Sequence, residues 1–225
     1  MKIELIVDHN PKSPISEAIK NIRTNLQFSS VDGDVKNILV TSSTAGEGKS
    51  FISSNLAVAF AKLGYNVLIV DSDLRLGRLH KVFNISNEEG LSNLLLTDVS
   101  KKYNSFIKKT DIENVSILTR GVVPPNPSEL LASDKNKQLV KLLSKKFDYV
   151  IWDGVPIMGL TDSRIMADLV DKIVIVATYK MTPMELLKST NGALDNFKNK
   201  IAGVVLNGVP MKGNHYYYYS KKYMN

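Results

Sequence analysis

Short runs of apolar residues alternate along this chain with segments whose apolar residues recur at helical spacing. The runs predict β-strands over residues 36–42, 66–73, 114–119, 147–153, 171–179 and 201–209. The spaced segments predict helices over residues 14–29, 49–64, 136–146, 161–170 and 182–199. Strands that are apolar on both faces and separated by helices indicate an α/β fold, with a mostly parallel sheet and helices on both faces.

The first predicted helix carries its own start signals. Ser13 is expected to cap it, and Pro14 suits its first position. The residues before it are expected to be extended. Its inward face is expected to consist of Ile15, Ile19, Ile22 and Leu26.

The segment SSTAGEGKS follows the first predicted strand and opens a helix. It is typical of a phosphate-binding loop, although Ser43 stands where the usual pattern has its first glycine. Gly46 and Gly48 let backbone amides turn around phosphate oxygens, and the helix N-terminus adds further amides. Lys49 is expected at the β- and γ-phosphates of ATP. The nucleotide-binding stretch is predicted to comprise Thr44, Ala45, Gly46, Glu47, Gly48, Lys49, Ser50 and Phe51.

Three aspartates stand at the ends of two other predicted strands, where ligands of parallel sheets bind. Asp71 and Asp73 alternate along VLIVDSD, so both side chains point to the same side, and Asp153 ends YVIWD. Magnesium prefers a few carboxylates together with phosphate oxygens and waters. Asp71, Asp153 and the Ser50 hydroxyl are therefore expected to hold Mg²⁺, which leaves Asp73 free to accept or orient a proton.

Composition narrows the class of protein. The chain has 225 residues and no cysteine, which excludes disulfide scaffolds and thiolate metal sites and fits a cytoplasmic protein. No apolar run approaches the length of a membrane span. The net charge of +7 favours acidic partners, but a mildly basic soluble enzyme fits it equally well. No nucleic-acid recognition motif accompanies the charge, so no nucleic acid is expected as a partner.

The C-terminal end has an unusual aromatic content. Five of the nine tyrosines lie in the last eleven residues, within GNHYYYYSKKYMN. They are surrounded by polar and basic residues, which is not typical of a packed core. An extended terminus of this kind suits a substrate that must reach a phosphate. The tyrosines are Tyr216, Tyr217, Tyr218, Tyr219 and Tyr223.

These motifs, in this order, resemble the bacterial tyrosine kinases that control capsule and exopolysaccharide assembly. The resemblance covers nearly the whole chain and includes SEAIKNIRTNLQFSS, GEGKS, VDSDLR, VIWDGVP, GVVLN and the tyrosine cluster. It looks most like the stand-alone cytoplasmic kinase of Gram-positive systems, in which a separate membrane protein is the activator. The family has a P-loop fold related to the Min and Par partition ATPases.

The resemblance implies roles for particular residues. Lys49 would act in catalysis with Asp71 and Asp153, which organise the metal. Asp73 would be the base or orienting group for the tyrosine hydroxyl, and Arg75 occupies the matching basic position. Asn207 approaches the adenine by analogy only, and a cap at the end of its strand is equally consistent with the sequence. Met181 and Met184 are interpreted as ordinary helix packing.

The resemblance also implies an assembly. The family's oligomerisation motif on the first helix appears here as Glu17, Lys20 and Arg23. Without the resemblance these residues predict only an exposed, weakly paired helix face. With it, we expect a homo-oligomeric ring that is recruited to the inner face of the plasma membrane by the cytoplasmic tail of its activator.

The sequence also departs from the family. The third motif is Asp153-Gly154-Val155-Pro156, where the family often has Asp-Thr-Pro-Pro, and Gly77 stands near a frequent family proline.

Together these features predict a kinase domain over residues 1–207, with helix 14–29 as its oligomerisation element, and a tyrosine tail over residues 208–225. The predicted function is ATP- and Mg²⁺-dependent tyrosine phosphorylation of protein substrates and of this tail, in trans within the oligomer, in the control of polysaccharide export. Two alternatives share the fold. The first is a partition-type ATPase, whose phosphate loop typically carries an extra early lysine that this chain lacks. The second is a nucleotide-dependent scaffold without kinase activity.

Overall fold

The computed structural model describes residues 3–29 and 35–210. Its centre is a seven-stranded sheet with the strand order β3-β4-β2-β5-β1-β6-β7. All neighbouring strands pair in parallel except β3, which pairs antiparallel with β4. The strands are β1 (Asn37–Ser42), β2 (Val67–Asp71), β3 (Lys108–Lys109), β4 (Val115–Leu118), β5 (Tyr149–Asp153), β6 (Lys172–Thr178) and β7 (Ile201–Asn207). The six predicted strands are confirmed, and the predicted α/β fold is correct.

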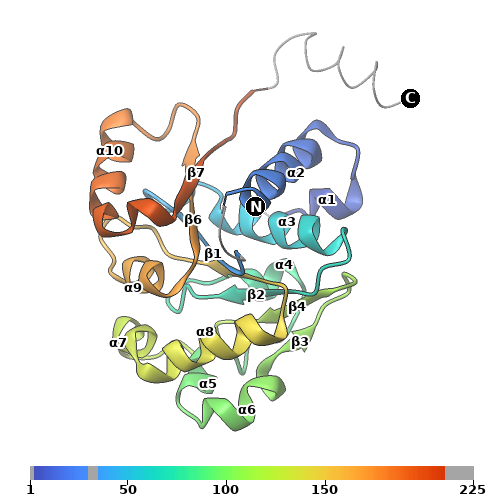
Figure 1. Ribbon diagram of the computed structural model, residues 1–225, viewed down its shortest axis with the longest axis vertical. Coiled ribbons are helices and arrows are strands. Elements are labelled where there is room, and N and C mark those ends of the chain that lie inside the picture. Colours follow the sequence, from blue (N-terminus) through green and yellow to red (C-terminus); the bar gives the residue numbers. More distant parts are fainter. Residues whose placement is uncertain (1–2, 30–34, 211–225) are drawn as a thin grey trace.

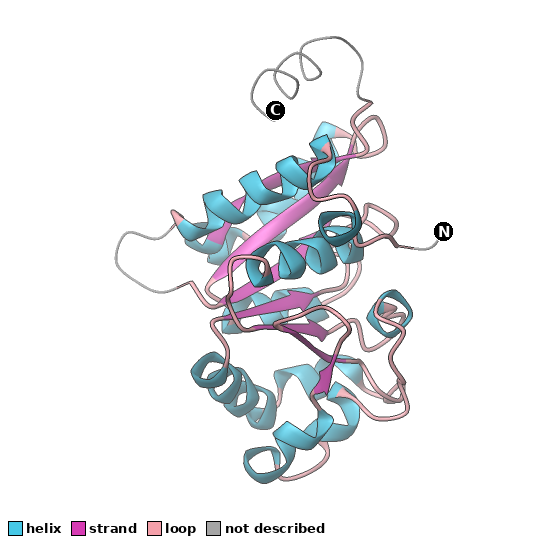
Figure 2. Ribbon diagram, turned by 90° about the vertical axis from the view of Figure 1, so that its right-hand side faces the viewer, coloured by secondary structure: helices cyan, strands magenta, loops and turns pink. Residues whose placement is uncertain are grey.

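Helices cover both faces of the sheet (Figure 1). One face packs against α1 (Ile6–His9), α2 (Pro14–Gln27), α3 (Lys49–Ala61) and α4 (Leu79–Val82). The other face packs against α5 (Leu91–Leu95), α6 (Val99–Phe106), α7 (Pro127–Ala132), α8 (Asp134–Lys146), α9 (Asp162–Leu169) and α10 (Met184–Ala193) with the short helix η1 (Asp195–Lys200). Figure 2 shows the strands running through the molecule between these two helical layers.

The predicted start of α2 is confirmed. The Ser13 hydroxyl accepts a hydrogen bond from the Ser16 amide at 3.1 Å, and Pro14 occupies the first turn. Ile19 and Leu26 are buried, whereas Ile15 is 40% exposed and lies outside the core.

The expectation of an extended N-terminal segment is wrong. Residues Ile6–His9 form a short helix against α3. The side chain of Asn55, buried in α3, accepts a hydrogen bond from the Val7 amide and donates one to the Glu4 carbonyl. These two bonds satisfy a buried amide side chain and hold the segment in the core, with Val7 fully packed.

None of the helices in the described part of the chain is long and apolar enough to cross a membrane.

Candidate nucleotide and metal site

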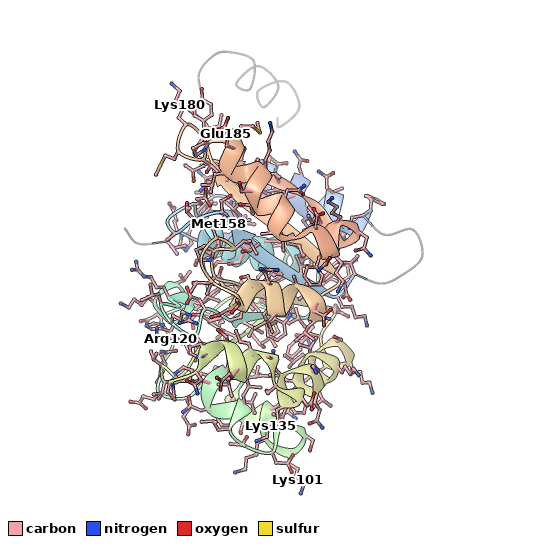
Figure 3. The ribbon with its side chains drawn as sticks, turned by 90° about the vertical axis from the view of Figure 1, so that its left-hand side faces the viewer. Lys101, Arg120, Lys135, Met158, Lys180 and Glu185 are labelled. Atoms are coloured by element: carbon pink, nitrogen blue, oxygen red, sulfur yellow. The ribbon has the colours of Figure 1, made fainter. Side chains whose placement is uncertain are left out.

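The residues predicted to bind nucleotide and metal lie at the carboxyl ends of the strands. Following the strand order, Asn207 ends β7, the phosphate loop follows β1, Asp153 ends β5 and Asp71 ends β2. Arg120, Met158 and Lys180 follow β4, β5 and β6, and Figure 3 shows these labelled residues along one side of the molecule. The topology therefore brings segments far apart in sequence to one edge, where ligands of parallel sheets bind.

The phosphate loop has the backbone expected of an anion cradle. Gly46 and Gly48 have φ of +83° and +94°, and Gly48 immediately precedes α3. Such conformations favour glycine and turn successive amides to one side. Thr44, Ala45 and Gly46 are exposed, so their backbone is open to a ligand. A Cβ added at Gly48 would lie 2.1 Å from Nδ2 of Asn207, so β7 ends directly against the loop.

Glu47 does not point toward the open side of the loop. Its carboxylate is buried, with 3% exposure. Oε2 accepts a hydrogen bond from the Thr44 amide at 2.7 Å, and Oε1 accepts one from the Thr182 hydroxyl. The Glu47 carbonyl accepts bonds from the Thr178 hydroxyl and from Nδ2 of Asn207. Glu47 therefore ties the phosphate loop to the ends of β6 and β7.

The ends of the phosphate loop are also fixed. Ser43 replaces the usual first glycine, and its buried hydroxyl accepts a hydrogen bond from Thr190 of α10 at 2.8 Å. Phe51 is partly buried and packs against the core.

Asp71 and Asp153 form a buried pair on neighbouring strands. They are register partners in the β2–β5 pairing, and both are at most 1% exposed. Oδ2 of Asp71 accepts from the Leu79 amide at 3.0 Å, and Oδ2 of Asp153 accepts from the Ser50 hydroxyl at 2.6 Å. Oδ1 of each aspartate has no hydrogen-bond partner among the described residues. Two adjacent buried carboxylates with a free oxygen each are a costly arrangement without a cation.

The electrostatics of the pair agree with its geometry. Burial, followed by the charge of Asp153, raises the pKa of Asp71 well above its usual value. Burial likewise raises the pKa of Asp153 to about 6, although the Ser50 hydrogen bond and the Lys49 charge partly offset it. Each carboxyl thus holds its proton more tightly than in water, and a divalent cation would displace that proton.

Gly77 explains how the loop after β2 closes over the pair. A Cβ at residue 77 would lie 2.2 Å from Oδ1 of Asp71 and 2.5 Å from the Asp73 carbonyl. Any larger residue would therefore fill the space beside the free oxygen of Asp71. The departure at Gly77 keeps this space open.

Asp73 differs from the buried pair. It is only partly buried, and its Oδ1 accepts hydrogen bonds from the amides of Arg75 at 3.1 Å and Leu76 at 2.8 Å. These bonds fix the carboxylate at the start of the loop without closing it off from solvent. Asp73 therefore keeps a partly exposed carboxylate beside the buried pair.

Arg75 contacts a carboxylate that sequence reasoning missed. Its Nε and Nη2 donate to the two oxygens of Asp162 at 3.0 and 3.2 Å, and Asp162 is 1% exposed. Ser128 donates to the same carboxylate at 2.7 Å, and Arg120 donates to the Arg75 carbonyl at 2.9 Å. The only sequence signal for Asp162 was an acidic residue opening a predicted helix. The structure thus engages Arg75 in a bidentate ion pair that braces the Asp73 loop.

The predicted oligomerisation residues do lie together on α2. Glu17 and Lys20 form an ion pair at 2.6 Å, and Nη1 of Arg23 donates to the Ala59 carbonyl of α3 at 3.1 Å. Glu17, Lys20 and Arg23 are only partly buried. The predicted phosphorylation sites Tyr216, Tyr217, Tyr218, Tyr219 and Tyr223 lie outside the described residues.

The interpretation of Met181 and Met184 as packed residues is wrong. Met181 is 72% exposed and Met184 is 61% exposed. Met181 lies in the turn between β6 and α10, and Met184 is the first residue of α10, so both stand at the exposed start of that helix.

Comparisons of the sequence with known proteins identify its relatives. A family model described as an AAA domain matches residues 35–203. The putative tyrosine-protein kinase CapB of Staphylococcus aureus is 39% identical over 215 residues, which cover 96% of this chain and 93% of that protein. The tyrosine-protein kinase YwqD of Bacillus subtilis is 37% identical over 223 residues, which cover 99% of this chain and 93% of that protein.

Solved structures give the same result. The chimerical protein CapA2B2 is 40% identical with a TM-score of 0.86 and coverage of 92% of this chain and 90% of that chain. The kinase domain of the Escherichia coli tyrosine kinase ETK is 32% identical with a TM-score of 0.88. The match covers 94% of this chain and 82% of that chain. The septum site-determining protein MinD of Pyrococcus horikoshii, complexed with Mg-ADP, is 24% identical with a TM-score of 0.62 and coverage of 78% and 72%. This last likeness shows the fold alone, and that fold is the one predicted from the sequence. The chain therefore belongs to the bacterial tyrosine kinase family, and within it to the Gram-positive type represented by CapB and YwqD.

Proposed function

We propose that the chain transfers the γ-phosphoryl group of ATP, with Mg²⁺, to tyrosine hydroxyls, including those of its own residues 216–223. The observation that carries this proposal is the pair of free buried oxygens on Asp71 and Asp153, beside the Ser50 hydroxyl and the phosphate loop. This donor set, with phosphate oxygens and waters, fits a magnesium ion. When bound, the ion would neutralise charge on the phosphates during transfer.

The chain's own residues supply the remaining functions. The amides of the loop and of the α3 N-terminus would bind the phosphates, and the Lys49 ammonium would neutralise their charge. Asp73, held by two backbone amides, would orient the tyrosine hydroxyl and accept its proton late in the transfer. A phenol has a pKa near 10, so full deprotonation before transfer is not required of this aspartate.

Asn207 is proposed to affect nucleotide binding mainly by holding the phosphate loop. Its Nδ2 donates to the Glu47 carbonyl at 3.1 Å, which favours a role in positioning the nucleotide-binding backbone. Arg75 is proposed to hold the Asp73 loop through Asp162, so its side chain acts on catalysis indirectly.

The assembly is proposed from the family. The face formed by Glu17, Lys20 and Arg23 would contact a neighbouring copy in a ring, and tail tyrosines would be phosphorylated in trans. A membrane activator would recruit the ring to the inner face of the plasma membrane through its cytoplasmic tail. The process served would be capsule or exopolysaccharide export. Residues 1–207 would form the kinase domain and residues 208–225 its substrate tail.

The test is transfer of labelled phosphate from ATP with Mg²⁺, followed by mass spectrometry of the C-terminal peptide. It should be run with and without the activator's cytoplasmic segment, beside a Lys49→Met control. Phosphate on Tyr216–Tyr219 or Tyr223 that is absent from the control is the expected result. ATP hydrolysis with an unmodified tail, even with activator present, would instead support a partition-type ATPase. Nucleotide binding without hydrolysis or transfer would support a scaffold.

A further inference from the structure

A groove of about 490 Å³ lies beside the loop that follows β4, between α5 and α7. Its walls are mainly apolar, and three apolar side chains remain strongly exposed there: Leu96 at 70%, Val122 at 59% and Val123 at 52%. Two prolines, Pro124 and Pro125, continue this surface. Exposed apolar side chains gathered in one concave surface typically mark a binding site.

The groove is connected directly to the loop that carries Asp73. Arg120 stands two residues before Val122, and its guanidinium donates to the Arg75 carbonyl at 2.9 Å. Ser128, in the helix that carries the groove residue Glu129, accepts a hydrogen bond from the Arg75 guanidinium at 3.2 Å. The walls of the groove and the Asp73 loop are therefore parts of one hydrogen-bonded unit.

The strand order places the groove on the acceptor side of the site. Along the carboxyl ends of the strands, Asn207 of β7 comes first. It is followed by β6, the phosphate loop after β1, and the carboxylates of β5 and β2. The loop after β4 comes next, on the far side of Asp71 and Asp73 from Asn207. A nucleotide bound at the phosphate loop, with its phosphates directed toward these carboxylates, would not occupy the space next to β4. The group that accepts the phosphate can therefore approach from that side.

We infer that this groove binds the residues that flank the acceptor tyrosine, and that its occupant is the tyrosine-rich C-terminal segment of this chain, supplied by the same or a second copy. This inference rests on the proposed kinase function and specifies where its substrate docks. The segment YYYYSKKYMN combines aromatic rings with two lysines. The groove offers apolar walls for the rings. Glu129 is the one charged side chain among the described residues that line it, and its sign complements Lys221 and Lys222.

Chain length permits this docking. The end of β7 and the end of β4 are five strand spacings apart in the sheet, which corresponds to about 24 Å. The nine residues 208–216 span up to about 30 Å when extended. The tyrosines after residue 216 therefore have the reach to enter the groove of their own chain, and the same length serves a neighbouring copy.

The test uses the full chain and an isotope-labelled peptide of residues 213–225, which mass spectrometry distinguishes from the chain's own tail. Leu96→Ser and Val123→Ser remove apolar surface at exposed positions that do not support the core. We expect each to raise the KM for the peptide about tenfold and to leave kcat, and the affinity for Mg-ADP, within about twofold of the wild type. Leu63→Ser is the matched control, because Leu63 is 52% exposed just after α3, at the opposite edge of the sheet.

A second measurement does not depend on catalysis. Binding of a fluorescent peptide with all five tyrosines changed to phenylalanine is measured with Mg-ADP present. Leu96→Ser should weaken this binding about tenfold, and replacing Lys221 and Lys222 of the peptide by glutamate should weaken it as well.

The outcomes separate this inference from the proposed function. If both groove variants phosphorylate the peptide with an unchanged KM, the peptide does not dock in the groove. The proposed kinase function would still hold. Peptide binding that weakens in Leu96→Ser, without any phosphate transfer in the wild type, would support the groove and contradict the kinase. A wild-type chain that neither binds nor phosphorylates the peptide would overturn the groove.

Discussion

The phosphate loop contains one buried carboxylate, Glu47, and lies beside a second buried acidic group, the pair Asp71 and Asp153. The hydrogen bonding of these two groups differs. Both oxygens of Glu47 accept hydrogen bonds from neighbouring residues, and its carbonyl accepts two more. Asp71 and Asp153 each leave one buried oxygen without a partner in the described part of the chain. Burial raises the pKa of both aspartates, with Asp153 at about 6.

Glu47, with all its hydrogen bonds made, supports the loop, whereas Asp71 and Asp153 form a site that still lacks a cation. A buried polar group with all its partners stabilises one backbone arrangement, so the Glu47 network holds the loop ready before any ligand binds. A buried carboxylate pair without a cation costs free energy, and that cost is recovered only when positive charge arrives.

Replacing the pair should have the largest effect on activity. Asp153→Asn keeps the shape but removes charge from the metal site, so phosphate transfer should fall about a thousandfold. Initial rates of tail phosphorylation at saturating ATP and Mg²⁺ measure this. Asp111→Asn, at an exposed aspartate far from the site in sequence, is the control. Near-normal activity of Asp153→Asn would show that the pair does not hold the metal.

Asp73 should affect the chemical step alone. Asp73→Asn retains the acceptor oxygen for the amides of Arg75 and Leu76, but it cannot take a proton. We expect kcat to fall about a hundredfold, while the dissociation constant for Mg-ADP changes less than about twofold. Single-turnover transfer and calorimetric titration separate the two quantities. Equal losses in both would contradict the assigned role.

The Glu47 network should affect binding more than chemistry. Glu47→Ala removes the acceptor for Thr44 and Thr182, so we expect Mg-ADP to bind about tenfold more weakly. Glu47→Gln keeps an acceptor for the Thr44 amide and should recover most of that loss. Hydrogen exchange at the Thr44 amide checks the cause, because exchange should accelerate in the alanine variant without nucleotide. Unchanged exchange in that variant would mean that Glu47 does not hold the loop.

The carboxylate pair should make the metal-free protein less stable as pH rises. The folded state of Asp153 has a pKa of about 6, above the ordinary 3.8, so the native chain binds more protons between these values. The free energy of unfolding therefore falls as pH increases through this window. Asp153→Asn should remove this loss and raise the metal-free free energy of unfolding at pH 7 by about 3 kcal/mol. Urea denaturation with chelator present, at pH 4.5 and pH 7, measures the difference; a variant less stable than the wild type at pH 7 would contradict it.

Much of this site could be predicted from local sequence patterns. The strands, the phosphate loop and the acids at strand ends each depend on residues close together in the chain, and parallel pairing then brings them to one edge. Glu47 was predicted to contact the nucleotide because it lies in the loop motif. Its inward direction depends on Thr182, which is 135 residues away and gives no local signal.

The parts that were missed depend on contacts between distant segments. Asp162 lies 87 residues from Arg75, so nothing near VDSDLR indicates their ion pair. The short helices α4 to α7 have too few turns to show a clear helical period, and no helix was predicted there. The same region forms the groove beside Asp73, whose existence requires the loop after β4 to meet α5 and α7.

The most direct test of whether Asp71 and Asp153 receive the magnesium ion is the release of protons when Mg-ADP binds. ADP with saturating Mg²⁺ is titrated into the protein at pH 6 in two buffers of different ionisation enthalpy. We predict net release of protons by the wild type, because a bound cation displaces the protons that burial makes Asp71 and Asp153 hold. Asp153→Asn should release far fewer protons. Equal binding heats in both buffers for the wild type, after correction for ADP itself, would contradict the claim that this pair receives the magnesium ion.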